Sequence, residues 1–201
     1  VLTSTGVTGW SDPSVTLAGP VTATQANALA LLTSGIVTAE ITAGSATSIN
    51  GALTGATGTD ALTITLTDAS ITANLLNTLD GKTSVAIDAA SIVAVAGSLA
   101  ALTAAYTGGV AGLGDEAITV IDASISVGDA NTLAGRTTSV VTATIADGAL
   151  ATLANLAETG HAYAVTVTDT TATASALTAL DAKTTVCLLY TSDAADEEDS
   201  V

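Results

Sequence analysis

The chain has almost no aromatic or sulfur-containing side chains. Its 201 residues include no Phe, no Met, one Trp and one Cys. Large globular cores gain much of their buried area from aromatic side chains. A thick core is therefore excluded, and any core must be thin and built from Ala, Val, Leu and Ile. A single cysteine also excludes stabilisation by disulfides within the chain.

Basic residues are equally scarce. Three Lys and Arg side chains face 19 Asp and Glu side chains, for a formal net charge of −16. Binding to nucleic acid depends on basic side chains that neutralise phosphates, and anionic membrane surfaces attract the same residues. No apolar run approaches the roughly 18–20 residues of a spanning helix. The composition argues against nucleic acid and membrane insertion, and it is compatible with divalent cations or a saline exterior.

What the chain does contain is a repeated pattern, seen most clearly at Ala61–Lys82. An alternating run is followed by a turn, a short helical pattern with Leu and a new alternating run, and this order recurs along the sequence. Period-two alternation predicts half-buried strands, and apolar residues three or four apart predict short helices. A repeat of roughly 21–26 residues is typical of solenoids.

Strands that follow one another through helices are expected to pair in parallel. We therefore predict an α/β solenoid, in which strand–turn–short helix coils stack into one parallel sheet with helices on the other side. Its outline would be leucine-rich-repeat-like, although the Asn-containing consensus of that family is absent. We expect residues 1–13 to be a linker or the end of a preceding coil, and residues 14–186 to be a single repeat domain of about seven coils.

The three basic residues recur in register. Lys82, Arg136 and Lys183 each follow a predicted helix, in the strings LDGK, LAGR and LDAK. A cation at this position meets the negative end of the helix dipole and its free carbonyls. The basic residues occur in alternate coils, and the coils between them end in longer segments. The true repeat is therefore predicted to be a pair, one tight coil and one loose coil.

Aspartates recur where the predicted strands end. Asp68, Asp88, Asp122 and Asp169 lie at strand exits, with Asp147 nearby. Stacked carboxylates could bind Ca²⁺, which takes several oxygen ligands, so the first four are the candidate metal ligands. The alternative is that Asp ends strands and starts turns by accepting hydrogen bonds from nearby backbone N–H groups. Neither an EF-hand loop nor the glycine-rich calcium nonapeptide is present.

No pattern in the sequence predicts catalysis. His161 is the only His, whereas a metal site or a nucleophilic triad needs further partners. The glycines of Gly109–Gly114 lack the Lys and the Ser or Thr of a phosphate-binding loop. Tyr106 and Tyr163 are expected to pack at coil edges.

The C-terminal segment departs from the preceding pattern. Cys187–Glu197, with the sequence CLLYTSDAADE, contains the only Cys and leads into an acidic cluster. The string resembles one reading frame of a transposon mosaic end plus an adapter from sequencing libraries. This resemblance implies that residues 187–201 are a non-native disordered tail and that the natural sequence continues past Val186. The alternative is a genuine acidic tail, which would also be disordered.

In wording, Ser14–Val186 resembles the Ala/Thr-rich β-strand-repeat segments of very large exported bacterial proteins, known from aquatic bacteria that include cyanobacteria. The strings LNTLDGKTSVAIDAASI and LTALDAKTTV carry the resemblance. It implies a secreted or cell-surface setting in a bacterium and a spacer or adhesive role. The implied partners are flanking repeats of the parent protein and a surface or matrix ligand. The resemblance supplies no catalytic residues.

Three functions follow as hypotheses. The first is a structural or adhesive repeat segment, a scaffold or spacer with a weakly binding extended face, which is not an enzyme and has no cofactor. The second is an extracellular binding module stabilised by Ca²⁺. The third is a fragment of a β-helix enzyme, which would need clustered Asp, Lys and Arg on one face. The basic residues lie on separate predicted coils, which disfavours the third hypothesis.

Overall fold

The computed structural model describes residues 13–190. In this part of the chain seven short helices alternate with short strands. Every strand pair whose register is defined is parallel. The predicted α/β class with parallel sheets and helices is therefore confirmed. Within the same residues, none of the helices is long and apolar enough to cross a membrane.

The chain forms two compact regions. The first comprises Val1–Val95 and Ala101–Leu113, and the second comprises Ala96–Ala100 and Gly114–Val201. Two elements, β6 (Ala94–Gly97) and α4 (Leu99–Thr107), contribute residues to both regions. We name each repeat by its helix, so that repeat 3 is the helix α3 with the strands before it.

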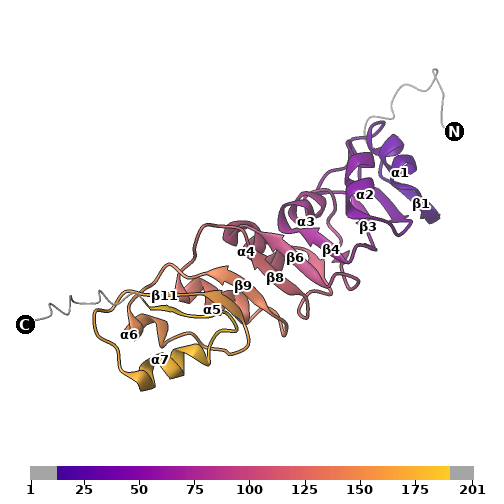
Figure 1. Cartoon of the computed structure of the whole chain (residues 1–201). Coiled ribbons are helices and arrows are strands. Elements are labelled where there is room, and N and C mark those ends of the chain that lie inside the picture. The colour runs from indigo at the N-terminus through magenta and orange to yellow at the C-terminus, as the bar shows by residue number, and fades with distance from the viewer. Residues whose placement is uncertain (1–12, 191–201) are drawn as a thin grey trace, which may run out of the picture. The chain divides into compact units, whose positions relative to one another are not determined.

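The first compact region holds three complete helices (Figure 1). Its other elements in chain order are β1 (Val15–Val21), α1 (Ala23–Ala30), β2 (Val37–Ile41), α2 (Ala46–Ala52), β3 (Ala61–Thr63), β4 (Ser70–Thr72), α3 (Ala73–Asp80), β5 (Ile87–Asp88) and β7 (Val110–Ala111).

The strands of the first region form because apolar and polar residues alternate. In β2, Val37, Ala39 and Ile41 are buried, and the residues between them are exposed. The strand lies between β1 and β3 in a three-stranded parallel sheet, and β5 pairs with β7. The register of β1 slips between Thr16 and Pro20, because proline has no N–H to donate to the ladder.

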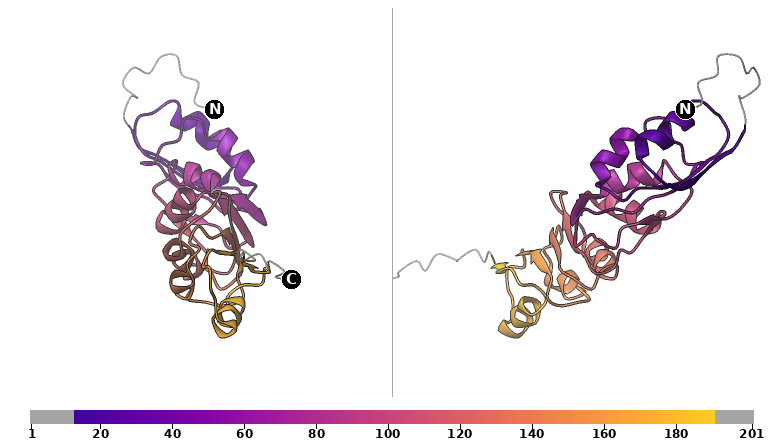
Figure 2. Two further views of the ribbon diagram at one scale, coloured as in Figure 1. Left: turned by 60° about the vertical axis from the view of Figure 1, so that its left-hand side comes forward. Right: turned by 90° about the vertical axis from the view of Figure 1, so that its right-hand side faces the viewer.

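The helices of the first region begin at hydroxyl side chains. Thr22, Ser45 and Thr72 each accept a hydrogen bond from the third helical N–H of α1, α2 and α3, which satisfies one of the four unpaired amides of a helix start. The helices α1 and α2 contact one another and lie beside the strands of their region (Figure 2). Each helix spans only two or three turns, so packing must hold it in place.

The second compact region repeats the same arrangement. Its elements in chain order are β8 (Ala117–Val120), α5 (Val127–Ala134), β9 (Val141–Thr144), α6 (Leu150–Leu153), β10 (Ala162–Ala164), β11 (Thr166–Val167), α7 (Ala174–Asp181) and β12 (Leu189–Tyr190). The strands β8, β9 and β10 are parallel neighbours, and β11 pairs with β12. The strand β12 falls within the segment predicted to be a non-native tail, and residues 191–201 lie outside the described residues.

The prediction of one parallel sheet is wrong. The described strands form four separate sheets, and several contacts between successive repeats are single bridges. One such bridge joins Thr65 to Asp88, and another joins Ile125 to Ile145. The strands contain only two to seven residues, and the turns between them interrupt the ladder before it can extend into one sheet.

The core follows most of the predicted apolar pairs, with exceptions in α1, α4 and α7. Leu76 and Leu79 of α3 are both fully buried, as are most of the corresponding residues in other repeats. In contrast, Leu32, which follows α1, is 63% exposed, and Leu177 of α7 is only half-buried. Leu99 of α4, the first member of its predicted pair, is half-buried as well.

Candidate functional site

The predicted aspartates lie at strand exits, but their partners come from another repeat. Asp68 Oδ2 accepts a hydrogen bond from Ala46 N at 2.7 Å, and Asp122 Oδ2 accepts one from Leu99 N at 2.6 Å. Each amide belongs to the first residue of a helix, 22 or 23 positions earlier in the chain. Each carboxylate therefore caps the helix of the preceding repeat.

Two further aspartates make the same contact. Asp147 Oδ2 accepts from Val127 N at 2.8 Å, and Asp169 Oδ2 accepts from Leu150 N at 2.6 Å. A helix start carries unpaired N–H groups and a partial positive charge, so a carboxylate stabilises it. We call Asp68, Asp122, Asp147 and Asp169 the capping aspartates.

The helices that the capping aspartates contact differ in whether they also have a local side-chain cap. The helix α2 also has a local cap, because Ser45 accepts from Ser48 N. The helix α6 is four residues long, and its N-cap residue Ala149 makes no side-chain hydrogen bond. Asp169 bonds the first amide of α6 as Asp68 bonds that of α2, but among the described residues no local hydroxyl caps α6 beside it.

Asp88 does not share this role. Its Oδ1 accepts from Ala90 N, two residues further along the chain, at 3.1 Å. This is the local turn contact that aspartate often makes.

The described residues contain no group of three or more His, Cys, Asp and Glu placed to hold a metal ion. Asp68, Asp122 and Asp169 use one carboxylate oxygen on a backbone amide, and no hydrogen bond joins the second oxygen to another described residue. Calcium binding by these residues stays a prediction. Thermal melting with calcium or with a chelator tests it, and an equal midpoint in both would reject it.

A second set of polar side chains lies buried just before the strands. Thr83 is 5% exposed; its hydroxyl donates to Leu62 O at 2.7 Å and accepts from Leu62 N at 3.0 Å. Thr184 bonds Tyr163 O and N in the same way, at 2.7 and 3.0 Å. In both repeats one threonine hydroxyl pairs the N–H and the C=O of a buried strand residue in the preceding repeat, as buried backbone groups require.

Three other residues are buried directly before a strand, and two of them replace the threonine at this contact. Asp60 is 4% exposed and its Oδ1 accepts from Val37 N at 2.8 Å. His161 is 4% exposed and its Nδ1 accepts from Val141 N at 3.1 Å. Glu116 is fully buried, and its Oε2 accepts from Gly114 N and Asp115 N within its own loop.

His161 forms the centre of a small buried cluster in the second region. Because Nδ1 accepts a hydrogen bond, the ring hydrogen belongs on Nε2. Nε2 is buried, has no hydrogen-bond partner among residues 13–190 and lies 3.8 Å from Glu158 Oε2. The ring centroid is 5.3 Å from that of Tyr163. Burial, and secondarily the charge of Glu158, raises the pKa of Tyr163 to about 12.

The cluster lacks the parts of a nucleophilic or metal centre. The Tyr163 hydroxyl donates to Ala130 O at 3.4 Å, and His161 bonds a backbone amide rather than a Ser or Cys side chain. A base such as His161 activates a nucleophile only within hydrogen-bond reach, and none of the described contacts of His161 joins it to a nucleophilic side chain. The sequence predicts that Tyr163 packs at the edge of a coil; it is packed, but its side chain is 1% exposed and so lies in the core.

The basic residues also reach across repeats. Lys82 Nζ donates to the carbonyl of Leu53, the C-cap residue of α2. Lys183 Nζ donates to Ala157 O, four residues beyond α6, at 3.4 Å. The prediction that a cation meets free carbonyls at a helix end describes Lys82 correctly, but the helix belongs to the preceding repeat.

Sequence reasoning missed the buried Asp60 and Glu116. A signal for them exists, because both, like His161, stand in a polar–Ala–apolar string: DAL, EAI and HAY. These strings occupy the position before the strand in the loose repeats, where tight repeats have threonine. Aligning the repeats against each other would have found them.

Comparison with known proteins gives no relative in which these contacts could be compared. No family model, no curated protein and no solved structure matches the chain.

Proposed function

We propose that the chain is a structural or adhesive repeat segment of a large bacterial protein that is secreted or displayed on the cell surface. In this proposal its strand–helix repeats stack as an α/β solenoid. The segment acts as a scaffold or spacer and offers an extended, weakly binding face. It has no catalytic role and needs no cofactor.

The observation that carries the proposal is the use of polar side chains between repeats. The capping aspartates, the buried threonines and Lys82 all bond the backbone of the preceding repeat. Buried polar groups must be paired to avoid a large desolvation cost. Functional groups that in an enzyme would converge on a substrate here join one repeat to the next.

The composition supports the same function. A net charge of −16 keeps a long array soluble and opposes its collapse onto other copies. The exposed strand residues, such as Thr38, Thr119 and Thr142, are small and polar. A surface of this kind offers many weak hydrogen-bonding positions rather than one deep pocket, as a spacer or a low-affinity adhesive face requires.

Small-angle X-ray scattering tests the scaffold role. A globular chain of 201 residues would have a radius of gyration of about 17 Å, and a globular tandem duplicate would have about 21 Å. A stack that lengthens with each repeat should exceed the second value by at least about one half. A duplicate that stays near 21 Å would reject the proposal.

The setting is tested separately on the full gene of the source organism. The proposal expects an export signal and further repeats of this kind around the segment. An intracellular enzyme without any export route would contradict it.

A further inference from the structure

The helix α7 is covered less than its counterpart α5. In α5 the first and fourth residues, Val127 and Ala130, are 5% and 0% exposed. In α7 the corresponding residues are Ala174, which is exposed, and Leu177, which is half-buried. Both helices contain eight residues and start at a hydroxyl cap, so the difference lies in what packs against them.

Repeat 6 is what covers α5. Asp147 Oδ2 bonds the Val127 amide at 2.8 Å. The side chain of Asn131, the fifth residue of α5, donates to Asn155 O at 2.8 Å and accepts from Ala157 N at 2.9 Å. Repeat 6 therefore bonds α5 at two places. The Asp147 carboxylate bonds the start of α5, and the backbone beyond α6 bonds Asn131 in the middle of α5.

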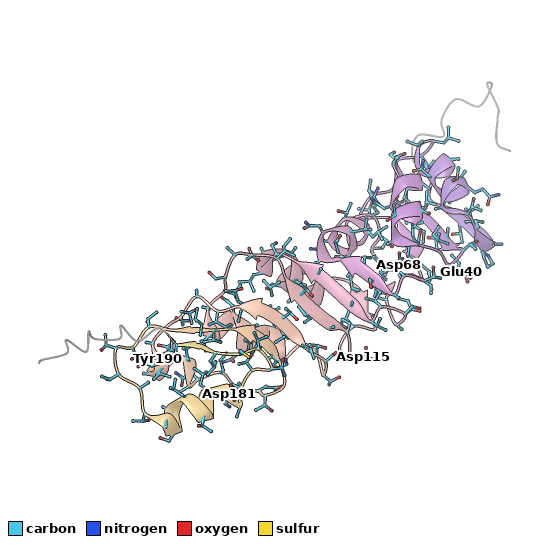
Figure 3. The ribbon with its side chains drawn as sticks, viewed as in Figure 1. Glu40, Asp68, Asp115, Asp181 and Tyr190 are labelled. Carbon is cyan, nitrogen blue, oxygen red and sulfur yellow. The ribbon has the colours of Figure 1, made fainter. Side chains whose placement is uncertain are left out.

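The corresponding positions of α7 lack these contacts within residues 13–190. No described side chain accepts from the Ala174 amide, whereas Thr173 bonds the amide of Ala176. The fifth residue of α7 is Thr178, which is exposed. We define Ala174, Leu177 and Thr178 as the α7 face. Figure 3 shows the helix with Asp181 labelled at its end.

We propose that the α7 face is a docking surface for a further strand–helix repeat of the loose type. Its defining chemistry is an aspartate at the strand exit that accepts from the Ala174 amide, with a short helix that packs on Leu177. The inference continues an interface that the molecule already contains between repeats 5 and 6. It rests on the proposed scaffold function, because both require repeats to stack.

Other occupants fit this surface less well. A second copy of the chain would have to offer its first repeat, in which Gly19, Pro20 and Val21 precede the helix cap. That repeat carries no aspartate at its strand exit, and Pro20 interrupts the strand register.

The test grafts a copy of residues 140–160 directly after Val186, in place of residues 187–201. These residues contain β9, α6 and Asp147. Thr185 and Thr138 bond the backbone in corresponding ways, which sets the register of the graft. The matched control carries alanine at the grafted copy of Asp147. The full chain and the chain ending at Val186 are the references.

We expect the graft to raise the melting midpoint by about 4 °C or more over both references, and the alanine control to lose most of this gain. Amide exchange at Ala174 should slow in the graft alone. An unchanged midpoint with unchanged exchange at Ala174 overturns the inference, as does a gain that does not depend on the aspartate. Dimers of the full chain in sedimentation velocity, abolished by Leu177→Arg, would identify a second copy as the occupant and also overturn it.

The graft experiment and the scattering experiment distinguish a failure of the α7 face from a failure of the scaffold proposal. A graft that does not dock on a chain whose own melting is unchanged rejects the α7 face alone. A tandem duplicate that scatters as a globule rejects the scaffold itself.

Discussion

Two loops that lead into strands each pair a buried amide of the preceding repeat, but they do so with different side chains. Residues 54–60 precede β3 in the first compact region, and residues 157–161 precede β10 in the second. Asp60 pairs both of its oxygens, Oδ1 with Val37 N and Oδ2 with Thr57 N, each at 2.8 Å. His161 pairs Nδ1 with Val141 N, but its Nε2 forms no hydrogen bond with the described part of the chain.

The comparison separates what the position requires from what it tolerates. The strand of the preceding repeat requires one acceptor for its amide, and Asp60, Thr83 and His161 all supply one. The second polar atom, Oδ2 of Asp60 or Nε2 of His161, faces the loop of its own repeat. Residue 57 presents an amide to Asp60, whereas residue 158 presents a carboxylate toward His161 at 3.8 Å.

The largest effect is expected from Asp60→Ala. This change leaves the amide of the buried Val37 unpaired and removes the acceptor of the Thr57 amide in the exposed loop, and it should lower the free energy of unfolding by about 3 kcal/mol. Urea denaturation followed by circular dichroism measures it. Asp60→Asn keeps one acceptor and should lose about half as much. An alanine variant within about 0.5 kcal/mol of wild type would show that these bonds do not hold the two repeats together.

The next prediction concerns variants that give the loop before β10 the chemistry of the loop before β3. His161→Ala should cost about 2 kcal/mol, because one buried amide loses its acceptor and a cavity opens. His161→Asp alone places a carboxylate beside Glu158 and should also destabilise the chain. The double variant Glu158→Thr/His161→Asp reproduces the order of Thr57 and Asp60.

A double-mutant cycle built from these variants measures the coupling. The double variant should recover to within about 0.5 kcal/mol of wild type. If it is as unstable as His161→Asp, the two loops are not equivalent, and the comparison fails.

A smaller effect distinguishes two helix starts. Asp169→Ala removes the side chain that bonds the start of α6, and it should cost about 1.5 kcal/mol. Asp68→Ala leaves the local cap Ser45 in place on α2 and should cost about 0.7 kcal/mol. Thermal and urea unfolding of the two variants give the difference. Equal losses, or a larger loss at Asp68, would contradict the role given to Asp169.

Lys82→Ala should cost about 0.5 kcal/mol at low salt, because its ammonium group bonds the end of α2. Arg136→Ala is the matched control. Arg136 occupies the same register, and no side-chain hydrogen bond or ion pair joins it to the residues between 13 and 190. The Lys82 effect should shrink in high salt. An equal loss at both positions would point to general charge effects rather than to the helix end.

Tyr163 gives the smallest effect at neutral pH and a distinct one in alkali. Its pKa is raised from 10.0 to about 12, so the folded state holds the phenol proton more tightly than the unfolded state does. The resulting stability is complete below pH 10 and is lost as the pH rises from 10 to about 12. Tyr163→Phe should flatten this alkaline decline. A variant that declines as steeply as wild type would contradict the assignment.

Local pattern predicted the elements well. The alternation Val37, Ala39, Ile41 marks a strand with one buried face, and the spacing of Leu76 and Leu79 marks a buried helix face. These predictions succeed because strand and helix periods depend on residues only a few positions apart. The extent of the sheets depends on turns between repeats, which the sequence pattern describes poorly.

The partners of the polar residues could not be read from the same pattern. The sequence alternative that an aspartate bonds a nearby amide describes Asp88, whose partner is two residues away. It does not describe Asp68, whose partner is 22 residues away. Sequence spacing shows that Asp68 ends a strand. Only the stacking of repeats brings the start of α2 beside it.

Amide hydrogen exchange tests the central claim, that strand-exit carboxylates hold the helix starts of the preceding repeat. The four amides to follow by NMR are those of Ala46, Leu99, Val127 and Leu150, in wild type and in single alanine variants of the capping aspartates. Each variant should speed exchange at its own partner amide, about 20 residues earlier, and leave the other three protected. Unchanged exchange at the partner amides, with faster exchange only beside each substituted aspartate, would contradict the account.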